Sequence, residues 1–178
     1  MTQPRPEFAP LEQEADEDLS ALGLSSAEGI YRSTAGGTTH ILVPTSQPID
    51  HLDPDPGRVA QASRACEALT LVPFRAIDKS NLHARVFASA VGVAEDPGSG
   101  SAAGPIGLLA TQIWGTHSDV TITMGAEIGR PSRLDVQTGD EICVGGRIVL
   151  AAEGLWGGKV NLHGPVGLLP SYTCMVTR

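Results

Sequence analysis

The chain is poor in basic residues. Its 178 residues contain 12 Lys and Arg against 20 Asp and Glu, which gives a formal net charge of −8 at pH 7. Nucleic acids and anionic membranes are bound through clustered positive charge. We therefore expect neither nucleic acid nor a membrane among its partners, and a small acidic metabolite would have to be held by local dipoles.

Cysteine is also scarce. Cys66, Cys143 and Cys174 lie far apart and form no CxxC pair, which argues against a zinc site and against a disulfide scaffold. We expect reduced, mostly buried thiols. No His, Asp or Cys cluster with chelating spacing is visible along the chain, so we predict no metal.

Long apolar runs are missing as well. No uninterrupted apolar span is long enough to cross a bilayer, and the first residues are acidic and contain proline instead of a basic end followed by an apolar run. We expect a cytoplasmic protein. The 41% of hydrophobic residues suffice for one substantial core.

The most informative segment is 85–110, RVFASAVGVAEDPGSGSAAGPIGLLA, in which an Asp-Pro turn and small residues lead from an apolar strand into an apolar helix. N–H groups at a helix start have no internal partner and lie at the positive end of the helix dipole, which favours a bound anion. Gly98, Ser99 and Gly100 would let such a ligand approach the main chain closely.

Two side chains flank this turn. Asp96 would act as a hydrogen-bonding or proton-handling group, and Ser101 could cap the helix or donate to the ligand. The same residues also suit an ordinary turn and helix cap without any ligand. His83 and Arg85 share one face of the preceding strand, where they either line the cleft or face solvent.

The helix at residues 101–114 is apolar nearly all round, which is typical of a buried helix, and Pro105 is expected in its first turn. A second helix is predicted at residues 55–68 and a short one at 18–28. Strands are predicted at residues 29–33, 38–45, 69–77, 82–88, 119–124, 132–137, 141–144 and 147–152. Gly145-Gly146 predicts a hairpin between the last two strands.

Three ordered motifs carry a family resemblance. HARVFASAVGVAEDPGSGSAAG at residues 83–104 resembles the signature HARxFAPxxGxxEDPxTGSAxG of the PhzF-like phenazine-biosynthesis proteins, which share the diaminopimelate epimerase fold. MGAEIGRPSR at 124–133 and VGGRIVLAAEG at 144–154 are similar to two later family motifs. Ser99 stands where the family usually has Thr, and Met124 where it usually has Gln.

The resemblance implies an α+β fold in which a curved, mostly antiparallel sheet is wrapped around a central helix. Only the second of the family's two halves is matched. This divides the chain into a solvated acidic arm at residues 1–19, a half domain at 20–154 and an atypical tail at 155–178, with a possible strand at 159–162.

The resemblance also implies a function, namely isomerisation or epimerisation of a small carboxylated metabolite by proton transfer without cofactor or metal. Asp96 and Ser101 would be catalytic, and the substrate would be bound by four residues, His83, Gly98, Ser99 and Gly100. No segment matches the family's catalytic Glu or its Gly-His pair. We therefore expect a homodimer or a complementary half, and the alternatives are a non-catalytic ligand-binding or scaffold module and a truncated gene product.

Overall fold

A computed structural model describes residues 1–11, 15–35, 37–154 and 172–177. The chain divides into two compact units, Met1–Gly146 and Arg147–Arg178. In the second unit, β10 (Ile148–Gly154) and β11 (Tyr172–Thr177) form an antiparallel pair. The strand expected at residues 159–162 lies outside the described residues.

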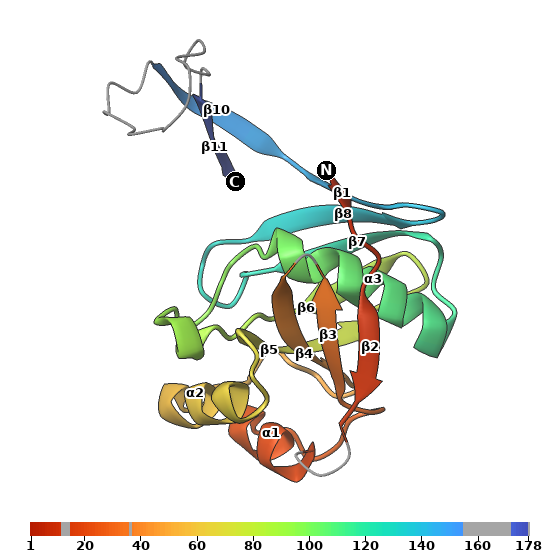
Figure 1. The fold of residues 1–178 in the computed structure, drawn as a ribbon, viewed down its shortest axis with the longest axis vertical. Helices are drawn as coiled ribbons and strands as arrows, with labels where there is room; N and C mark the ends of the chain where they lie inside the picture. The colour runs from red at the N-terminus through yellow and green to blue at the C-terminus, as the bar shows by residue number, and fades with distance from the viewer. Residues whose placement is uncertain (12–14, 36, 155–171, 178) are drawn as a thin grey trace, which may run out of the picture. The chain divides into compact units, whose positions relative to one another are not determined.

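The first unit is built on one nine-stranded sheet with the order β1-β9-β8-β7-β6-β5-β4-β3-β2 (Figure 1). Its strands are β1 (Thr2–Gln3), β2 (Glu7–Pro10), β3 (Tyr31–Ala35), β4 (Thr38–Pro44), β5 (Thr70–Ala76), β6 (Asn81–Ala84), β7 (Asp119–Met124), β8 (Ser132–Thr138) and β9 (Ile142–Gly146). Neighbours are antiparallel except for β4 with β5 and β6 with β7. The sheet is therefore mostly antiparallel, as predicted.

The two parallel pairs explain the two longer helices, because parallel neighbours need a crossover connection. Helix α2 (Pro56–Ala65) connects β4 to β5, and α3 (Gly100–Trp114) connects β6 to β7. The carboxylate of Asp55 caps α2 by accepting a hydrogen bond of 2.9 Å from the Arg58 amide. A shorter helix, α1 (Ala15–Leu22), packs beside α2.

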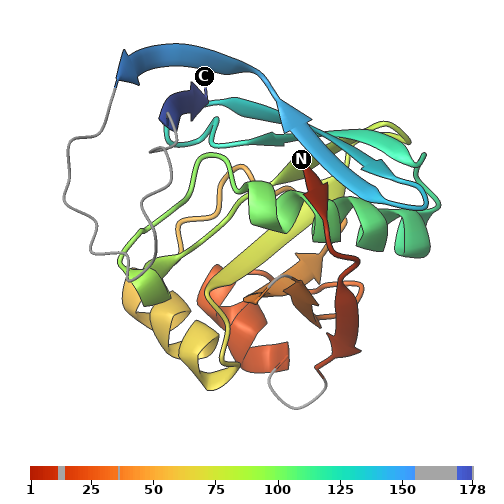
Figure 2. The ribbon, with the colours of Figure 1, turned by 45° about the horizontal axis from the view of Figure 1, so that its top comes forward.

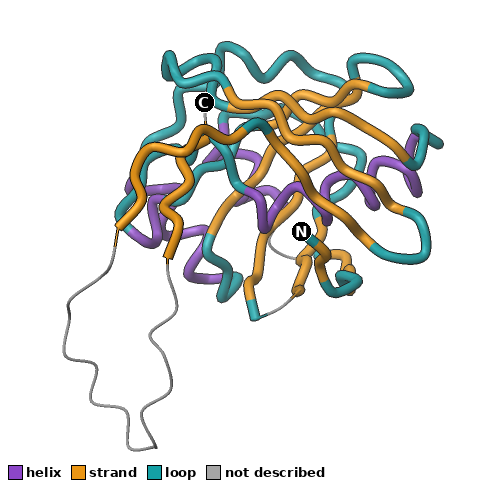
Figure 3. The backbone as a smooth tube through the Cα atoms, turned by 90° about the horizontal axis from the view of Figure 1, so that it is seen from above, coloured by secondary structure: helices purple, strands orange, loops and turns teal. Residues whose placement is uncertain are grey.

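Helix α3 is the centre of the core. All residues from 102 to 110 are buried, and the sheet curves around the helix (Figures 2 and 3). Gly107 is needed for this packing, since a Cβ there would lie 2.8 Å from Cγ1 of Val136. Ile106 and Leu109 are 0% and 2% exposed, which confirms the predicted buried central helix.

The other face of the sheet carries a second apolar cluster. Alternate residues of β4 divide between the two faces: Leu42 packs with α3, whereas Ile41 and Val43 pack with α1 and α2. Figure 1 shows α1 and α2 on the side of β4 and β5 away from α3. Of the helices in the described part of the chain, none combines the length and the apolar character that crossing a bilayer requires.

The structure corrects several local predictions. Within the arm expected at residues 1–19, Thr2–Gln3 and Glu7–Pro10 are edge strands that pair with β9 and β3. The helix expected at 18–28 runs from Ala15 to Leu22. Pro105 is the sixth residue of α3 and so lies in its second turn, where it has no N–H to offer the carbonyl of Ser101.

The hairpin predicted at Gly145-Gly146 is also wrong. Strand β9 pairs with β8 on one edge and with β1 on the other, where Thr2 is opposite Cys143. Strand β10 pairs with β11 instead. A glycine pair between two β-rich runs predicts a turn, but it does not reveal that another strand occupies the edge.

Candidate functional site

The turn that precedes α3 is held from two sides. The Asp96 amide donates to the Val86 carbonyl at 2.8 Å. This bond connects the turn to the chain that directly follows β6. The Asp96 carboxylate accepts from the Gly98 amide at 3.1 Å. On the far side, the Ser132 hydroxyl donates to the Pro97 carbonyl. The main chain of the predicted site is therefore anchored to the sheet.

Close contacts explain the glycines around this turn. A Cβ at Gly98 would lie 2.9 Å from the Ser132 Oγ. Gly125 has φ +71°, and a Cβ there would lie 2.5 Å from the Arg130 carbonyl oxygen and 2.8 Å from the Pro97 Cα. The second motif of the sequence, residues 124–133, thus supports the first.

The start of α3 presents backbone donors. Ser99 occupies the N-cap position in an extended conformation and makes no side-chain capping bond. The first intrahelical bond runs from the Ala103 amide to the Ser99 carbonyl at 3.2 Å. The amides before Ala103 have no carbonyl one turn back within the helix, and the helix dipole adds positive potential there. This geometry suits a carboxylate or phosphate.

The structure brings the predicted residues of the turn together. Asp96, Gly98 and Ser99 directly precede α3, and Gly100 and Ser101 are its first two residues. Ser99 is 6% exposed, Ser101 is exposed, and their hydroxyl oxygens are 3.4 Å apart.

A buried histidine that the sequence analysis did not single out faces the same core. His40 on β4 is 2% exposed, and its Nδ1 lies 2.7 Å from the Thr70 Oγ1. Desolvation by burial lowers the pKa of His40 to about 4, although the charge of Asp96 acts to raise it. His40 is therefore neutral at pH 7, and its Nε2 has no hydrogen-bond partner among the described residues.

Its strand position is the signal that could have found it. His40 is two residues before Leu42, whose side chain packs with α3, so alternation along β4 directs both toward that helix. Its cross-strand neighbour on β3 is Ser33, which is fully buried, and the Ser33 Oγ also has no partner among the described residues. Among the described residues, this part of the core thus contains two polar atoms without a hydrogen-bond partner, the His40 Nε2 and the Ser33 Oγ. The charge of Asp96 acts on His40.

His83 is not brought together with the turn residues. It lies on β6 between Leu82 and Ala84, which pack with α3, so the His83 side chain points to the other face of the sheet. There its Nε2 lies 2.9 Å from the Glu127 Oε1, and its Nδ1 lies 3.6 Å from the Asp50 Oδ1.

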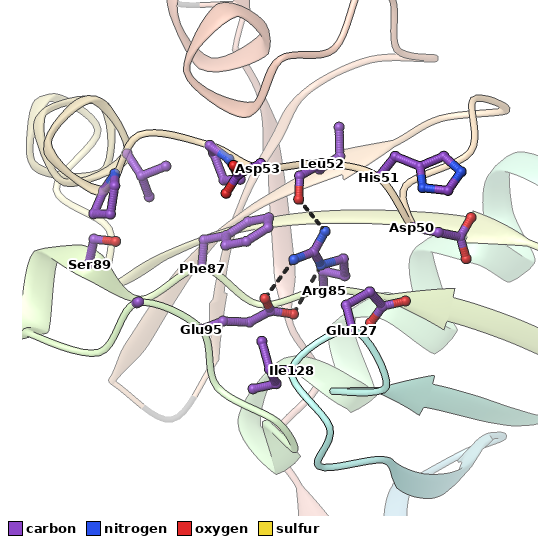
Figure 4. A pocket seen from close by; sticks show the side chains of 14 residues that line it. Asp50, His51, Leu52, Asp53, Arg85, Phe87, Ser89, Glu95, Glu127 and Ile128 are labelled. Carbon is purple, nitrogen blue, oxygen red and sulfur yellow. Dashed lines mark hydrogen bonds and ion pairs between the residues drawn. The ribbon is translucent and has the colours of Figure 1, made fainter.

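A cavity of about 620 Å³ lies on this face. Figure 4 shows its central ion pair, in which the Arg85 guanidinium meets the Glu95 carboxylate in a two-pronged contact. The Nε–Oε1 and Nη2–Oε2 distances are 3.0 and 2.7 Å, and Nη1 donates to the carbonyls of Ile49 and Leu52. Burial alone would lower the Arg85 pKa, but the hydrogen bonds and charge of Glu95 raise it. Arg85 thus faces this cavity rather than solvent.

Comparison with known proteins gives a consistent picture. The sequence profile of the phenazine biosynthesis-like protein family, PhzC/PhzF, matches residues 1–154. An uncharacterized isomerase from Deinococcus radiodurans is 30% identical over 121 residues, which are 62% of this chain and 39% of that protein.

Solved structures show the same fold. The PhzF-family phenazine biosynthesis protein of Bacillus anthracis aligns with a TM-score of 0.65 at 20% identity, over 81% of this chain and 55% of that one. A predicted epimerase from Pseudomonas aeruginosa aligns with a TM-score of 0.66 at 23% identity, over 82% and 54%. The chain therefore spans about half the length of these solved relatives.

Proposed function

Because the chain belongs to the phenazine biosynthesis-like (PhzC/PhzF) family, we propose that it takes part in proton transfer on a small carboxylated metabolite at the start of α3. The reaction is an isomerisation or epimerisation, in which a proton leaves one carbon and a proton returns to the same molecule. No oxidant or reductant is required, and we expect no cofactor. The observation that carries this proposal is the anchored turn with an uncapped helix start and Asp96 beside it.

The proposed roles follow from the chemistry of the groups. The substrate carboxylate binds the backbone donors of Ser99 and Gly100, and that of Gly98 once Asp96 releases it, while the Ser101 hydroxyl, which is exposed, donates a further hydrogen bond. Asp96 holds or moves a proton. The helix dipole stabilises negative charge that develops as the proton leaves carbon.

The partner is part of the proposal. The sequence contains no segment that resembles the Glu-bearing or Gly-His segments of the family. We therefore propose that the working site needs a complementary half or a second copy of this chain. A dimer or heteromer would cover the open side of the site and exclude water from it.

The alternative is a ligand-binding or scaffold module without catalysis. The absence of a recognisable catalytic Glu in this sequence favours it. The enzyme and the ligand-binding module both require anion binding at the turn, a scaffold module does not, and only the enzyme requires carbon-bound proton exchange.

Anion binding is tested by NMR titration of the full chain with malonate and with inorganic phosphate. The amide signals of Gly98, Ser99, Gly100 and Ser101 should move with saturation. The exposed loop at Gly139 and Asp140 serves as the internal control and should not move. Uniform or absent shifts would contradict the site.

Catalysis is tested in D₂O with a panel of L-amino acids, in which the exchangeable carbon-bound proton lies beside a carboxylate, and deuterium incorporation is measured by mass spectrometry at several protein concentrations. If the chain assembles with itself, exchange should rise with the fraction of dimer measured by sedimentation. Asp96→Asn should slow exchange at least about tenfold, while Asp140→Asn should not. Saturable anion binding without any exchange would favour the binding module, and exchange that is indifferent to Asp96→Asn would refute the role of Asp96.

A further inference from the structure

A second cluster of ligating side chains lies on the face of the sheet opposite α3. Asp50, His83 and Glu127 come from the segment after β4, from β6 and from the turn after β7, and each offers one donor atom within 4.8 Å of the others. Their side chains are 50%, 11% and 13% exposed. We propose that these three residues form a binding site for a divalent first-row metal ion, such as Mn²⁺ or Zn²⁺.

The donor set matches the chemistry of such ions. Imidazole nitrogen and carboxylate oxygen are ligands for Zn²⁺, and carboxylates also suit Mn²⁺. In the octahedral coordination that Mn²⁺ favours, neighbouring donors about 2.1 Å from the metal stand at a right angle and are about 3.0 Å apart. The distance from the His83 Nε2 to the Glu127 Oε1 is 2.9 Å.

Asp50 completes the set from the solvent side. Its Oδ1 lies 3.6 Å from the His83 Nδ1. Because Asp50 is half exposed and its donor atom lies within 4.8 Å of those of His83 and Glu127, rotation of its side chain can bring an oxygen to the same ion. If Asp50 instead stays beside Nδ1, it accepts the Nδ1 proton of His83. The lone pair is then on Nε2 and free for the metal, as in many histidine metal sites in which a carboxylate orients the ring.

The charge around the cluster also favours a cation. The Glu127 Oε2 is buried and has no hydrogen-bond partner among the described residues, a costly state for a carboxylate. Arg85 is the positive side chain that lines the same cavity, but its guanidinium is engaged by Glu95 and by two backbone carbonyls. The charge of Arg85 also acts on Asp50 and Glu127, but one guanidinium faces the four carboxylates of Asp50, Asp53, Glu95 and Glu127 in this cavity.

This site is separate from the proposed proton-transfer site. Asp96 and Ser101 do not line the cavity that contains Asp50 and Glu127, and His83 points away from α3. Figure 4 shows the side chains of Asp50 and Glu127 on the same side of Arg85, away from Glu95. The proposal of a metal site can therefore be tested separately from the proposal of an isomerase.

The test is a titration of the full chain with Mn²⁺, with free Mn²⁺ measured by electron paramagnetic resonance. Mn²⁺ is chosen because it prefers oxygen and nitrogen donors over the thiols of the three cysteines. We expect one saturable site per chain. Glu127→Gln and His83→Gln should each weaken binding at least about tenfold, whereas Asp53→Asn, which changes a carboxylate of the same cavity outside the cluster, should leave the affinity within about twofold.

Two further measurements keep the result interpretable. Asp50→Asn changes a half-exposed side chain and should fold normally, so its expected several-fold loss of affinity does not depend on the buried variants being stable. In the wild type, Mn²⁺ should broaden the ring signals of His83 before those of His51 and His117. Absence of saturable binding, unchanged affinity in Glu127→Gln or Asp50→Asn, or earlier broadening of His51 would overturn the proposal and leave the cluster as histidine–carboxylate ion pairs only.

Discussion

Gly125 lies against Pro97, and a Cβ added at Gly125 would stand 2.8 Å from the Cα of Pro97 and 2.5 Å from the Arg130 carbonyl oxygen. This contact joins the turn after β7 to the turn before α3. Both segments are held by backbone atoms that cannot rotate away, so the geometry of the proposed anion site depends on a residue outside it.

Gly125→Ala should therefore be more harmful than Gly129→Ala. Both glycines have a positive φ, +71° and +70°, but a Cβ at Gly129 meets nothing within 4 Å. We expect Gly129→Ala to lose about 1 kcal/mol from backbone strain, and Gly125→Ala to lose at least about 2 kcal/mol. Urea unfolding measures both losses. Equal losses would contradict the contact with Pro97.

The Arg85–Glu95 pair gives a second comparison. Both side chains are 6% exposed, so Glu95→Gln leaves the buried Arg85 cation without its ion-pair partner and should cost about 3 to 5 kcal/mol. The exposed pair of Arg133 and Asp135 is the control, with side chains 66% and 63% exposed, and Asp135→Asn should cost less than about 1 kcal/mol. Chemical denaturation distinguishes the two, and a loss below about 1 kcal/mol for Glu95→Gln would show that the pair is solvated.

The sequence predicts the central helix well because its signal is local. An apolar run from Ala102 to Ala110 cannot be solvated on any side, whatever the rest of the fold. The short strands β1 and β2 are missed for the opposite reason. Strand β1 has only two residues and β2 contains Glu7 and Pro10, so neither shows a strand pattern by itself, and they are strands because the open edges of β9 and β3 accept them.

The two proposed sites, the turn before α3 and the cluster of Asp50, His83 and Glu127, also differ in how far the sequence predicts them. The turn residues Asp96 to Ser101 are contiguous, so the sequence places them together, although it does not show that Ser132 and Gly125 hold them. Asp50, His83 and Glu127 are distant in sequence and meet only in the fold, where β6 and β7 are neighbours. The prediction that no chelating cluster exists relied on spacing along the chain, and this spacing does not show which distant residues lie close together in space.

Burial of α3 predicts a large loss on truncation. Leu109 is 2% exposed within the main apolar cluster, and Leu109→Ala should lower the free energy of unfolding by about 2 to 5 kcal/mol through lost packing and a cavity. Ile77, which is 55% exposed, provides the matched control, and Ile77→Ala should cost less than about 0.5 kcal/mol. A loss below about 1 kcal/mol for Leu109→Ala would count against the buried helix.

The burial of His40 predicts a dependence of stability on pH. The unfolded chain takes up this proton near pH 6.5, whereas the folded chain does so only near pH 4, because desolvation lowers the pKa of His40. Between these values the unfolded state binds more protons, so the contribution is complete above pH 6.5 and is lost as the pH falls toward 4. Between pH 7 and pH 5 it amounts to about 2 kcal/mol.

The comparison of His40→Phe with His117→Gln isolates this effect. Urea unfolding at pH 7 and pH 5 gives the loss of stability on acidification for each protein. This loss should be about 2 kcal/mol greater for the wild type than for His40→Phe. His117→Gln, which removes an exposed histidine, should behave like the wild type. The difference between the two pH values matters, since the absolute stability of His40→Phe also reflects the changed packing beside Thr70. NMR titration gives the direct check, because the His40 ring should remain neutral until the pH approaches 4. A His40 ring that titrates between pH 6 and 7 would mean that water reaches its Nε2, and the polar part of the core beside Asp96 would then be open.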